Sequence, residues 1–66
     1  MEIKAKQNAS KWTKDRLSRH PGPFIEQTRG FMINPQPPHS GECVLVQEID
    51  SGWLGWFPLQ DIDIIA

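Results

Sequence analysis

Residues 52–65 read GWLGWFPLQDIDII and hold the densest apolar run of the 66-residue chain, including two of its three tryptophans. From Trp53 to Phe57 every residue is aromatic or apolar apart from one glycine, a composition that suits a pleated, half-buried strand. Pro58 has no amide proton to donate to a neighbouring strand. The sequence therefore predicts a strand that ends at this proline.

The residues that follow the proline predict a turn and a second strand. The segment 59–61 has the length of a single 3₁₀ turn. Ile62 and Ile64 then alternate with Asp61 and Asp63, which is typical of a strand with one apolar and one polar face. We expect these two strands to help close a small barrel over buried rings.

The first of the two strands carries bulk on both faces. Because side chains alternate along a strand, Trp53, Gly55 and Phe57 share one face. Leu54 and Trp56 share the other face. Neither face can be left fully in water without a cost in free energy, so we expect both to be at least partly covered.

The segment 55–62, GWFPLQDI, resembles the carboxy-terminal signature of SH3 domains. That signature is a glycine, an aromatic residue, a bulky apolar residue, a proline, two variable residues, an aromatic residue and a β-branched residue. The resemblance implies an SH3-like barrel in which Phe57 points inward and Trp56 outward. It implies little about proline-motif binding, because only Pro58 matches the residues with which SH3 domains grip polyproline helices.

Several features depart from that family. Asp61 stands where the signature has its second aromatic residue, and the chain contains no tyrosine. The tyrosine-containing motif that SH3 domains carry near the amino terminus is missing. Trp53 lies too close to Gly55 to be the family's ligand-binding tryptophan, which sits a hairpin earlier. The resemblance therefore bears on the barrel more than on its ligand.

The amino-terminal third predicts a strand and a helix. Residues 3–6 alternate as a first strand. Residues 11–19 lack glycine and proline and contain several helix formers, with Asn8 and Ser10 as candidate caps. The helix is expected to end by His20, because the proline that follows disfavours helical geometry in the residue before it.

The middle of the chain predicts a second strand and a stiff loop. Residues 24–28 suit a strand, which Arg29 and Gly30 are expected to break. The short apolar run 31–33 could extend a hairpin or cover one end of a barrel. Three prolines make the segment 34–41 an extended surface loop.

Residues 42–48 predict the next strand, with Val44 and Val46 as its β-branched pair, and a tight turn at 50–52 leads onward. The whole chain, 1–66, thus predicts one mostly β domain, a five-stranded SH3-like barrel with one short helix inserted between the first and second strands. The alternative is an α+β sheet with the helix across one face.

Length and composition narrow the class of protein. A chain of this size buries only ~60% of its unfolded surface, so its stability relies on three Trp and three Phe. No apolar run approaches ~20 residues, so no transmembrane helix is expected, and no signal peptide is visible. The single cysteine, Cys43, cannot form an internal disulfide and indicates a reducing, cytoplasmic location.

Charge is unevenly distributed along the chain. Residues 1–20 carry six basic and two acidic side chains, a net charge of +4, whereas residues 21–66 carry one basic and six acidic, a net charge of −5. Such asymmetry can mark an anionic partner for one end. It can equally reflect complementarity within the fold or a solvated surface, which we favour.

The sequence predicts neither a metal site nor a catalytic centre. His20, His39 and Cys43 are the only soft metal ligands, too few for tetrahedral zinc and at no known ligand spacing. Cys43 fits a small core residue better than a nucleophile. Asp61 and Asp63 share a strand face that could suit a cation, although a solvated face explains them better. We therefore expect a protein without a cofactor that is not an enzyme.

Two candidate binding surfaces remain. The first is apolar and comprises Leu54, Trp56 and Pro58, with Pro37 from the proline loop, because an outward tryptophan beside a stiff loop could be a protein-binding hot spot. The alternative interpretation is that Trp56 lies under the helix or under the loop.

The second surface is the basic helix. Its side chains could contact phosphates and Trp12 could stack on a base; the basic residues are Lys11, Lys14, Arg16 and Arg19. The alternative, which we favour, is that Trp12 anchors the helix on the sheet and the charges face water.

These observations predict a small non-enzymatic binding module that acts through contacts with an unidentified protein partner and not on a membrane. The alternative is a small nucleic-acid-binding or regulatory protein that uses the basic helix 11–19. A third class is a structural subunit that folds fully only within a larger complex.

Overall fold

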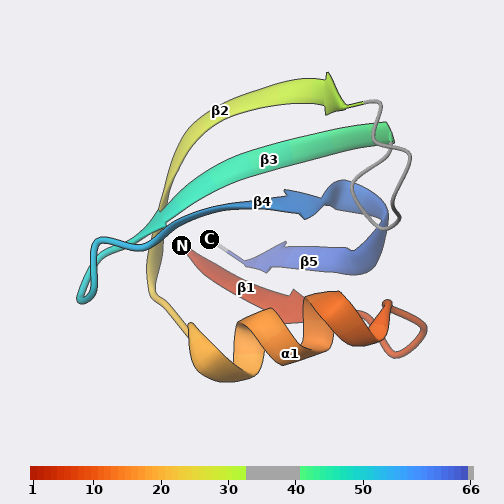
Figure 1. Ribbon diagram of the computed structural model, residues 1–66, viewed down its shortest axis with the longest axis horizontal. Coiled ribbons are helices and arrows are strands. Elements are labelled where there is room, and N and C mark those ends of the chain that lie inside the picture. The colour runs from red at the N-terminus through yellow and green to blue at the C-terminus, as the bar shows by residue number, and fades with distance from the viewer. Residues whose placement is uncertain (33–40, 66) are drawn as a thin grey trace.

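Five strands, one α-helix and one 3₁₀ turn make up the fold in the computed structural model, which describes residues 1–32 and 41–65. In chain order they are β1 (Glu2–Ala5), α1 (Lys11–Arg19), β2 (Phe24–Met32), β3 (Gly41–Glu48), β4 (Leu54–Pro58), η1 (Leu59–Asp61) and β5 (Ile62–Ile65) (Figure 1). The predictions of a mostly β chain, and of a helix between its first and second strands, are confirmed.

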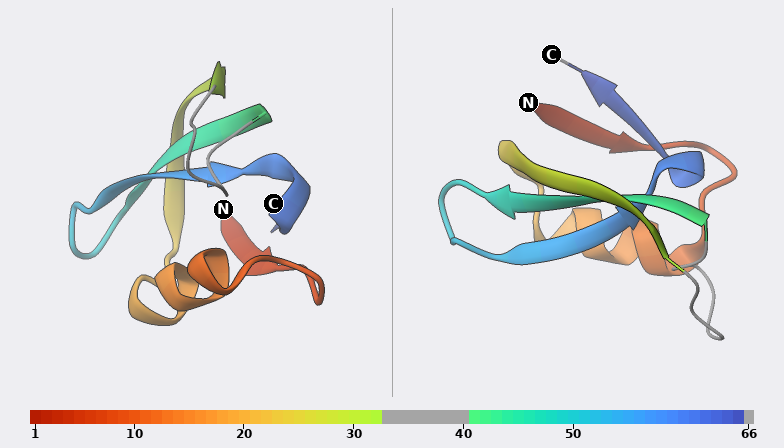
Figure 2. Two further views of the ribbon diagram at one scale, coloured as in Figure 1. Left: turned by 45° about the vertical axis from the view of Figure 1, so that its right-hand side comes forward. Right: turned by 90° about the horizontal axis from the view of Figure 1, so that it is seen from above.

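The strands pair as two antiparallel sheets (Figure 1, Figure 2). β2, β3 and β4 form a three-stranded meander, and β1 pairs with β5 while α1 runs beside β1. Among the described strands, no ladder closes the two sheets into a barrel. The sheets meet where the Met1 nitrogen donates to the Phe24 carbonyl at 2.8 Å and the Phe24 N–H donates back to the Met1 carbonyl at 2.9 Å.

α1 begins and ends where the sequence predicts. Ser10 is its N-cap, and the Ser10 Oγ accepts a hydrogen bond from the Thr13 N–H at 3.3 Å. At the other end the His20 N–H donates to the Arg16 carbonyl at 2.8 Å, and Pro21 stops the helix. Of the two candidate caps, only Ser10 serves α1, because it directly precedes the first helical residue.

The core fills the space between the two sheets and α1. Phe57 is fully buried, and its ring meets the rings of Phe24 and Trp12 edge to face, each at a centroid distance of 6.2 Å. Trp12 and Leu17 of α1 pack against this cluster, so tertiary packing holds a helix too short to be stable alone. The buried apolar members are Ile3, Phe24, Val44, Val46, Phe57 and Ile62.

The alternation predicted around β4 is confirmed on its core side. The Trp53 ring lies 5.8 Å from the Phe57 ring and stacks on the His20 imidazole at 4.1 Å. A Cβ atom placed on Gly55 would overlap the Trp53 ring. The Trp53 ring therefore occupies the space that a side chain at Gly55 would need.

β2 is longer than the sequence predicts. A break at Arg29 and Gly30 is wrong, because the strand continues through both residues to Met32. A β-bulge between Glu26 and Thr28 shifts the register, and pairing with β3 resumes beyond it. Pairing with the long strand β3 keeps these residues extended, although their own strand propensity is weak.

The remaining boundaries differ by one residue. The first strand spans Glu2–Ala5 in place of 3–6, and β3 begins at Gly41 in place of residue 42. Of the expected apolar run, Phe31 belongs to β2. Ile33 and most of the expected proline loop, 34–40, lie outside the described residues.

Candidate functional site

One side of the three-stranded meander faces away from the core and carries no charged side chain among its described residues. Its members alternate with the buried Val44, Val46 and Phe57, so they project from the opposite side of the sheet. We call this surface the outer face. It consists of Ile25, Thr28, Gly30, Leu45, Gln47, Leu54 and Trp56.

Trp56 covers the centre of the outer face. Its ring extends from β4 across β3 towards β2, where a Cβ atom on Gly30 would lie 3.9 Å from the ring. Gly30 pairs with Cys43 on β3, and Cys43 is fully buried. A methyl group at Gly30 would thus only touch the indole, whose ring stays partly exposed.

Two exposed aliphatic residues lie in the row of the outer face next to that of Trp56. Leu54 is 54% exposed and Ile25 is 52% exposed. Both lie opposite Gln47, one on each side of β3, so the three form a row across the meander. Exposed apolar residues that gather on one uncharged face differ from the scattered single residues of an ordinary surface. The outer face is therefore the candidate contact surface.

The sequence predicted this surface in part. Leu54 and Trp56 lie on the outer face as its alternation indicates, whereas Pro58 is fully buried and we leave it out of the surface. Pro37 lies outside the described residues. Ile25 was missed as a member of this surface. The predicted strand 24–28 already placed it on the face opposite Phe24, so a buried Phe24 implies an Ile25 outside the core.

The basic side chains of α1 are largely engaged within the chain. Lys14 Nζ donates to the Gln7 carbonyl at 2.8 Å, and the Arg19 guanidinium lies 3.3 Å from the Asp15 carboxylate. The Arg16 guanidinium lies over the Trp12 ring, 5.3 Å from its centroid. Trp12 itself packs on the core, as the favoured interpretation of the helix expects.

These contacts add nothing to the interpretation of α1 as a nucleic-acid interface. Lys11 is exposed, as are Lys14 and Arg19, so the helix still presents positive charge to water. Contact with phosphates would compete with the neighbours these groups already have. Nucleic-acid binding by α1 stays a prediction, with no structural observation in its favour.

A buried carboxylate joins the helix end to the β3–β4 turn. Glu48 is 5% exposed, and its carboxylate accepts hydrogen bonds from the Ser51 hydroxyl and from the Gly22 N–H, the latter at 2.8 Å. His20 Nδ1 lies 3.2 Å from the same carboxylate. The Ser51 hydroxyl, then the Gly22 N–H and His20, hold the pKa of Glu48 below its ordinary value.

This arrangement predicts an acid-dependent loss of stability. Because the folded pKa of Glu48 lies below the unfolded one, its contribution is complete above the unfolded value of about 4.3 and is lost as the pH falls through the folded value. In urea titrations across this range, Glu48→Gln should be less stable than the wild type at pH 6. The difference should shrink as the pH falls, and a constant difference would contradict the assignment. The exposed Glu42→Gln on the same strand controls for loss of charge.

A second buried carboxylate joins the helix start to η1. Asp61 is 8% exposed, and its Oδ2 accepts from the Ser10 N–H at 3.1 Å and the Ser10 hydroxyl at 2.9 Å. It also accepts from the hydroxyl of the fully buried Thr13 at 2.8 Å. A carboxylate at a helix start is favoured by the helix dipole. Asp61 therefore has a structural role, and it shares no solvated face with Asp63.

The described residues offer no cluster of metal ligands. No three of their His, Cys, Asp or Glu side chains gather where they could hold a metal ion. Cys43 is a buried thiol whose pKa is raised by burial, which suits packing better than reactivity. His39 lies outside the described residues. In the part of the chain described, no helix has both the length and the apolar character needed to span a membrane.

Comparison with known proteins assigns no family. No protein-family model, no curated protein and no solved structure matches this chain.

Proposed function

We propose that the two sheets are the halves of an SH3-like barrel that serves as a protein-binding module through its outer face. The observation that carries the binding proposal is the uncharged outer face, with Trp56 at its centre and the exposed Leu54 and Ile25 in the adjacent row. Cores of protein interfaces are depleted of charge and enriched in tryptophan. The partner is expected to offer an apolar surface to the indole.

The barrel half of the proposal rests on three features. A 3₁₀ turn, η1, follows Pro58 and leads directly into β5, where the SH3 resemblance has its signature. Phe57 is buried and the neighbouring Trp56 projects from the other side of β4, as that resemblance implies. The paired hydrogen bonds between Met1 and Phe24 bring the edge of one sheet onto the other, as a partly closed barrel requires.

The helix supplies a reason for the departure from the family signature. α1 occupies the connection between β1 and β2, where SH3 domains have a long loop. The carboxylate that replaces the second aromatic residue, Asp61, binds the capping residue of this helix. The inserted helix and the altered signature are thus one structural feature.

Leu54→Lys tests the binding surface with little risk to the fold. Because Leu54 is exposed, the change should leave the free energy of unfolding within about 0.5 kcal/mol of the wild type. A displayed library of random peptides selected on the wild-type chain should yield ligands that bind this variant at least about tenfold more weakly, by calorimetry. Binding should weaken because the lysine charge would be buried against an apolar partner.

Ile65→Lys is the matched control, because Ile65 is an exposed apolar residue on β5 of the other sheet. Ligands of the outer face should bind this variant as they bind the wild type. Selected peptides that bind all three proteins equally, or a library that yields no ligand, would contradict the proposed function.

A further inference from the structure

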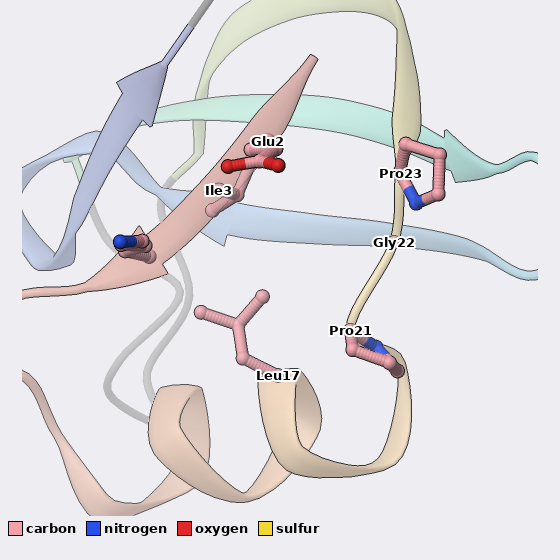
Figure 3. Close-up of a pocket in the computed structure, with 7 residues that line it drawn as sticks. Glu2, Ile3, Leu17, Pro21, Gly22 and Pro23 are labelled. Carbon is pink, nitrogen blue, oxygen red and sulfur yellow. The ribbon is translucent and has the colours of Figure 1, made fainter.

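A cavity of about 410 Å³ opens between β1, the last turns of α1 and the segment that leads into β2 (Figure 3). Leu17 reaches from the helix towards β1, and Pro21 and Pro23 stand on the connecting segment (Figure 3). It lies apart from the outer face, whose residues belong to β2, β3 and β4. Its lining is formed by Glu2, Ile3, Lys4, Leu17, Pro21, Gly22 and Pro23.

The hydrogen-bond pattern of β1 decides which of its backbone groups face this cavity. Lys6 lies opposite Asp61 in the continued β1–β5 register, and the Lys6 N–H donates to the Asp61 carbonyl at 2.8 Å. In an antiparallel ladder such pairs alternate, so Glu2 and Lys4 also bond to β5. The backbone groups of Ile3 consequently point to the other edge of β1, as those of Met1 do when they bond to Phe24.

On that edge the backbone of Ile3 has no partner among the described residues. If the antiparallel pairing that starts at Met1 and Phe24 extended along β1, Ile3 would lie opposite Gly22. However, Gly22 has turned away, with φ at +93°, and its N–H donates to the Glu48 carboxylate at 2.8 Å. Ile3 lines the cavity, so a partner that sits there can reach its N–H and carbonyl.

We propose that this cavity binds an extended peptide segment of a protein partner, which adds to the free edge of β1. The N–H and carbonyl of one peptide residue would pair with the carbonyl and N–H of Ile3, as in other complexes formed by strand addition. Apolar side chains of the segment would contact Leu17, Pro21 and Pro23. The pairing gives the N–H and carbonyl of Ile3 a peptide partner in place of the water that an open cavity admits.

The site therefore selects for backbone amide chemistry more than for one side chain. Within the cavity one residue pair is available, at Ile3, because Met1 is already bonded to Phe24 and Ala5, which points to the same edge, does not line the cavity. The short edge predicts weak binding of an isolated peptide, with a dissociation constant on the order of 1 mM. A partner that also contacts the outer face would bind more tightly.

Nuclear magnetic resonance titration of the ¹⁵N-labelled chain tests the proposal with a capped valine-leucine-valine tripeptide as the probe. The Ile3 amide resonance should show one of the largest shifts and should saturate. A tripeptide N-methylated at the leucine cannot donate to the Ile3 carbonyl and should bind about tenfold more weakly. N-methylation at the following valine, whose N–H points away from β1, is the matched control and should change binding little.

Two outcomes would overturn the proposal. The first is an Ile3 resonance that does not move at tripeptide concentrations of about 10 mM, well above the expected dissociation constant. The second is equal binding of the two N-methylated peptides, which would mean that the backbone is not recognised. Leu54→Lys should leave this titration unchanged and Leu17→Ala should weaken it, so failure here and failure of the outer-face proposal are distinguishable. If Leu17→Ala fails to fold, the paired peptides still decide the question on the wild-type chain.

Discussion

Replacement of Asp61 by alanine is expected to lower the free energy of unfolding by about 3 kcal/mol. The change removes the one oxygen that accepts hydrogen bonds from the Ser10 N–H, the Ser10 hydroxyl and the Thr13 hydroxyl. Thr13 is fully buried, so its hydroxyl would lose this partner without gaining access to water. A chain of this length has a total stability of about 3–10 kcal/mol, so the change removes roughly a third of it or more.

Asp61→Asn and Asp63→Ala separate the causes of that loss. Asparagine keeps an acceptor oxygen in nearly the same place, so the first variant should lose less than half as much, mainly the charge at the helix start. Asp63 is exposed two residues away on β5, and its change should stay within about 0.5 kcal/mol. Urea unfolding followed by circular dichroism measures all three variants. An Asp61→Ala chain as stable as Asp63→Ala would contradict the role assigned to this carboxylate.

Gly55→Ala is expected to destabilise the fold by about 1–3 kcal/mol through overpacking. The added methyl group would overlap the Trp53 ring. That ring cannot move aside freely, because it stacks on His20 and contacts Phe57 in the core. The loss should appear in urea unfolding together with a change in tryptophan fluorescence, since Trp53 must be displaced.

Gly30→Ala is the matched change on the other side of the same sheet. There the new methyl group would lie 3.9 Å from the Trp56 ring, an ordinary contact distance. Alanine also restricts the unfolded chain more than glycine does, so this variant should be as stable as the wild type or more stable by up to about 1 kcal/mol. Equal destabilisation by both substitutions would show that the Trp53 contact does not limit the space at Gly55.

Local patterns predicted much of this fold because several signals agreed at the same residues. Ser10 followed by helix formers and a terminal Pro21 set the bounds of α1, and Pro58 marked the end of β4 correctly. The alternation through Trp53, Gly55 and Phe57 put the right residues in the core. Closure into an SH3-like barrel stays a prediction, since the described strands pair as two sheets.

What the sequence missed depends on contacts between distant residues. The pair at Arg29 and Gly30 has weak strand propensity, and only its partner strand keeps it extended. Asp61 gave the pattern of a solvated carboxylate, because the hydroxyls that bury it lie some fifty residues earlier in the chain. The cavity beside Ile3 forms because Gly22 turns away from β1 and bonds to Glu48. The sequence around Ile3 or around Gly22 does not predict that turn.

The pairing of β1 with β5 also constrains the order in which the chain can assemble. The meander joins neighbours in sequence, whereas β1 and β5 come from opposite ends of the described chain and close a loop that contains everything between them. Long loops are entropically costly to close, and such contacts form late. In a chain whose meander had formed before this loop closed, the apolar surface around Val44, Val46 and Phe57 would lack Ile3 and Ile62 as its cover. Aggregation would compete with folding of such a chain until β1 and β5 pair and cover this surface.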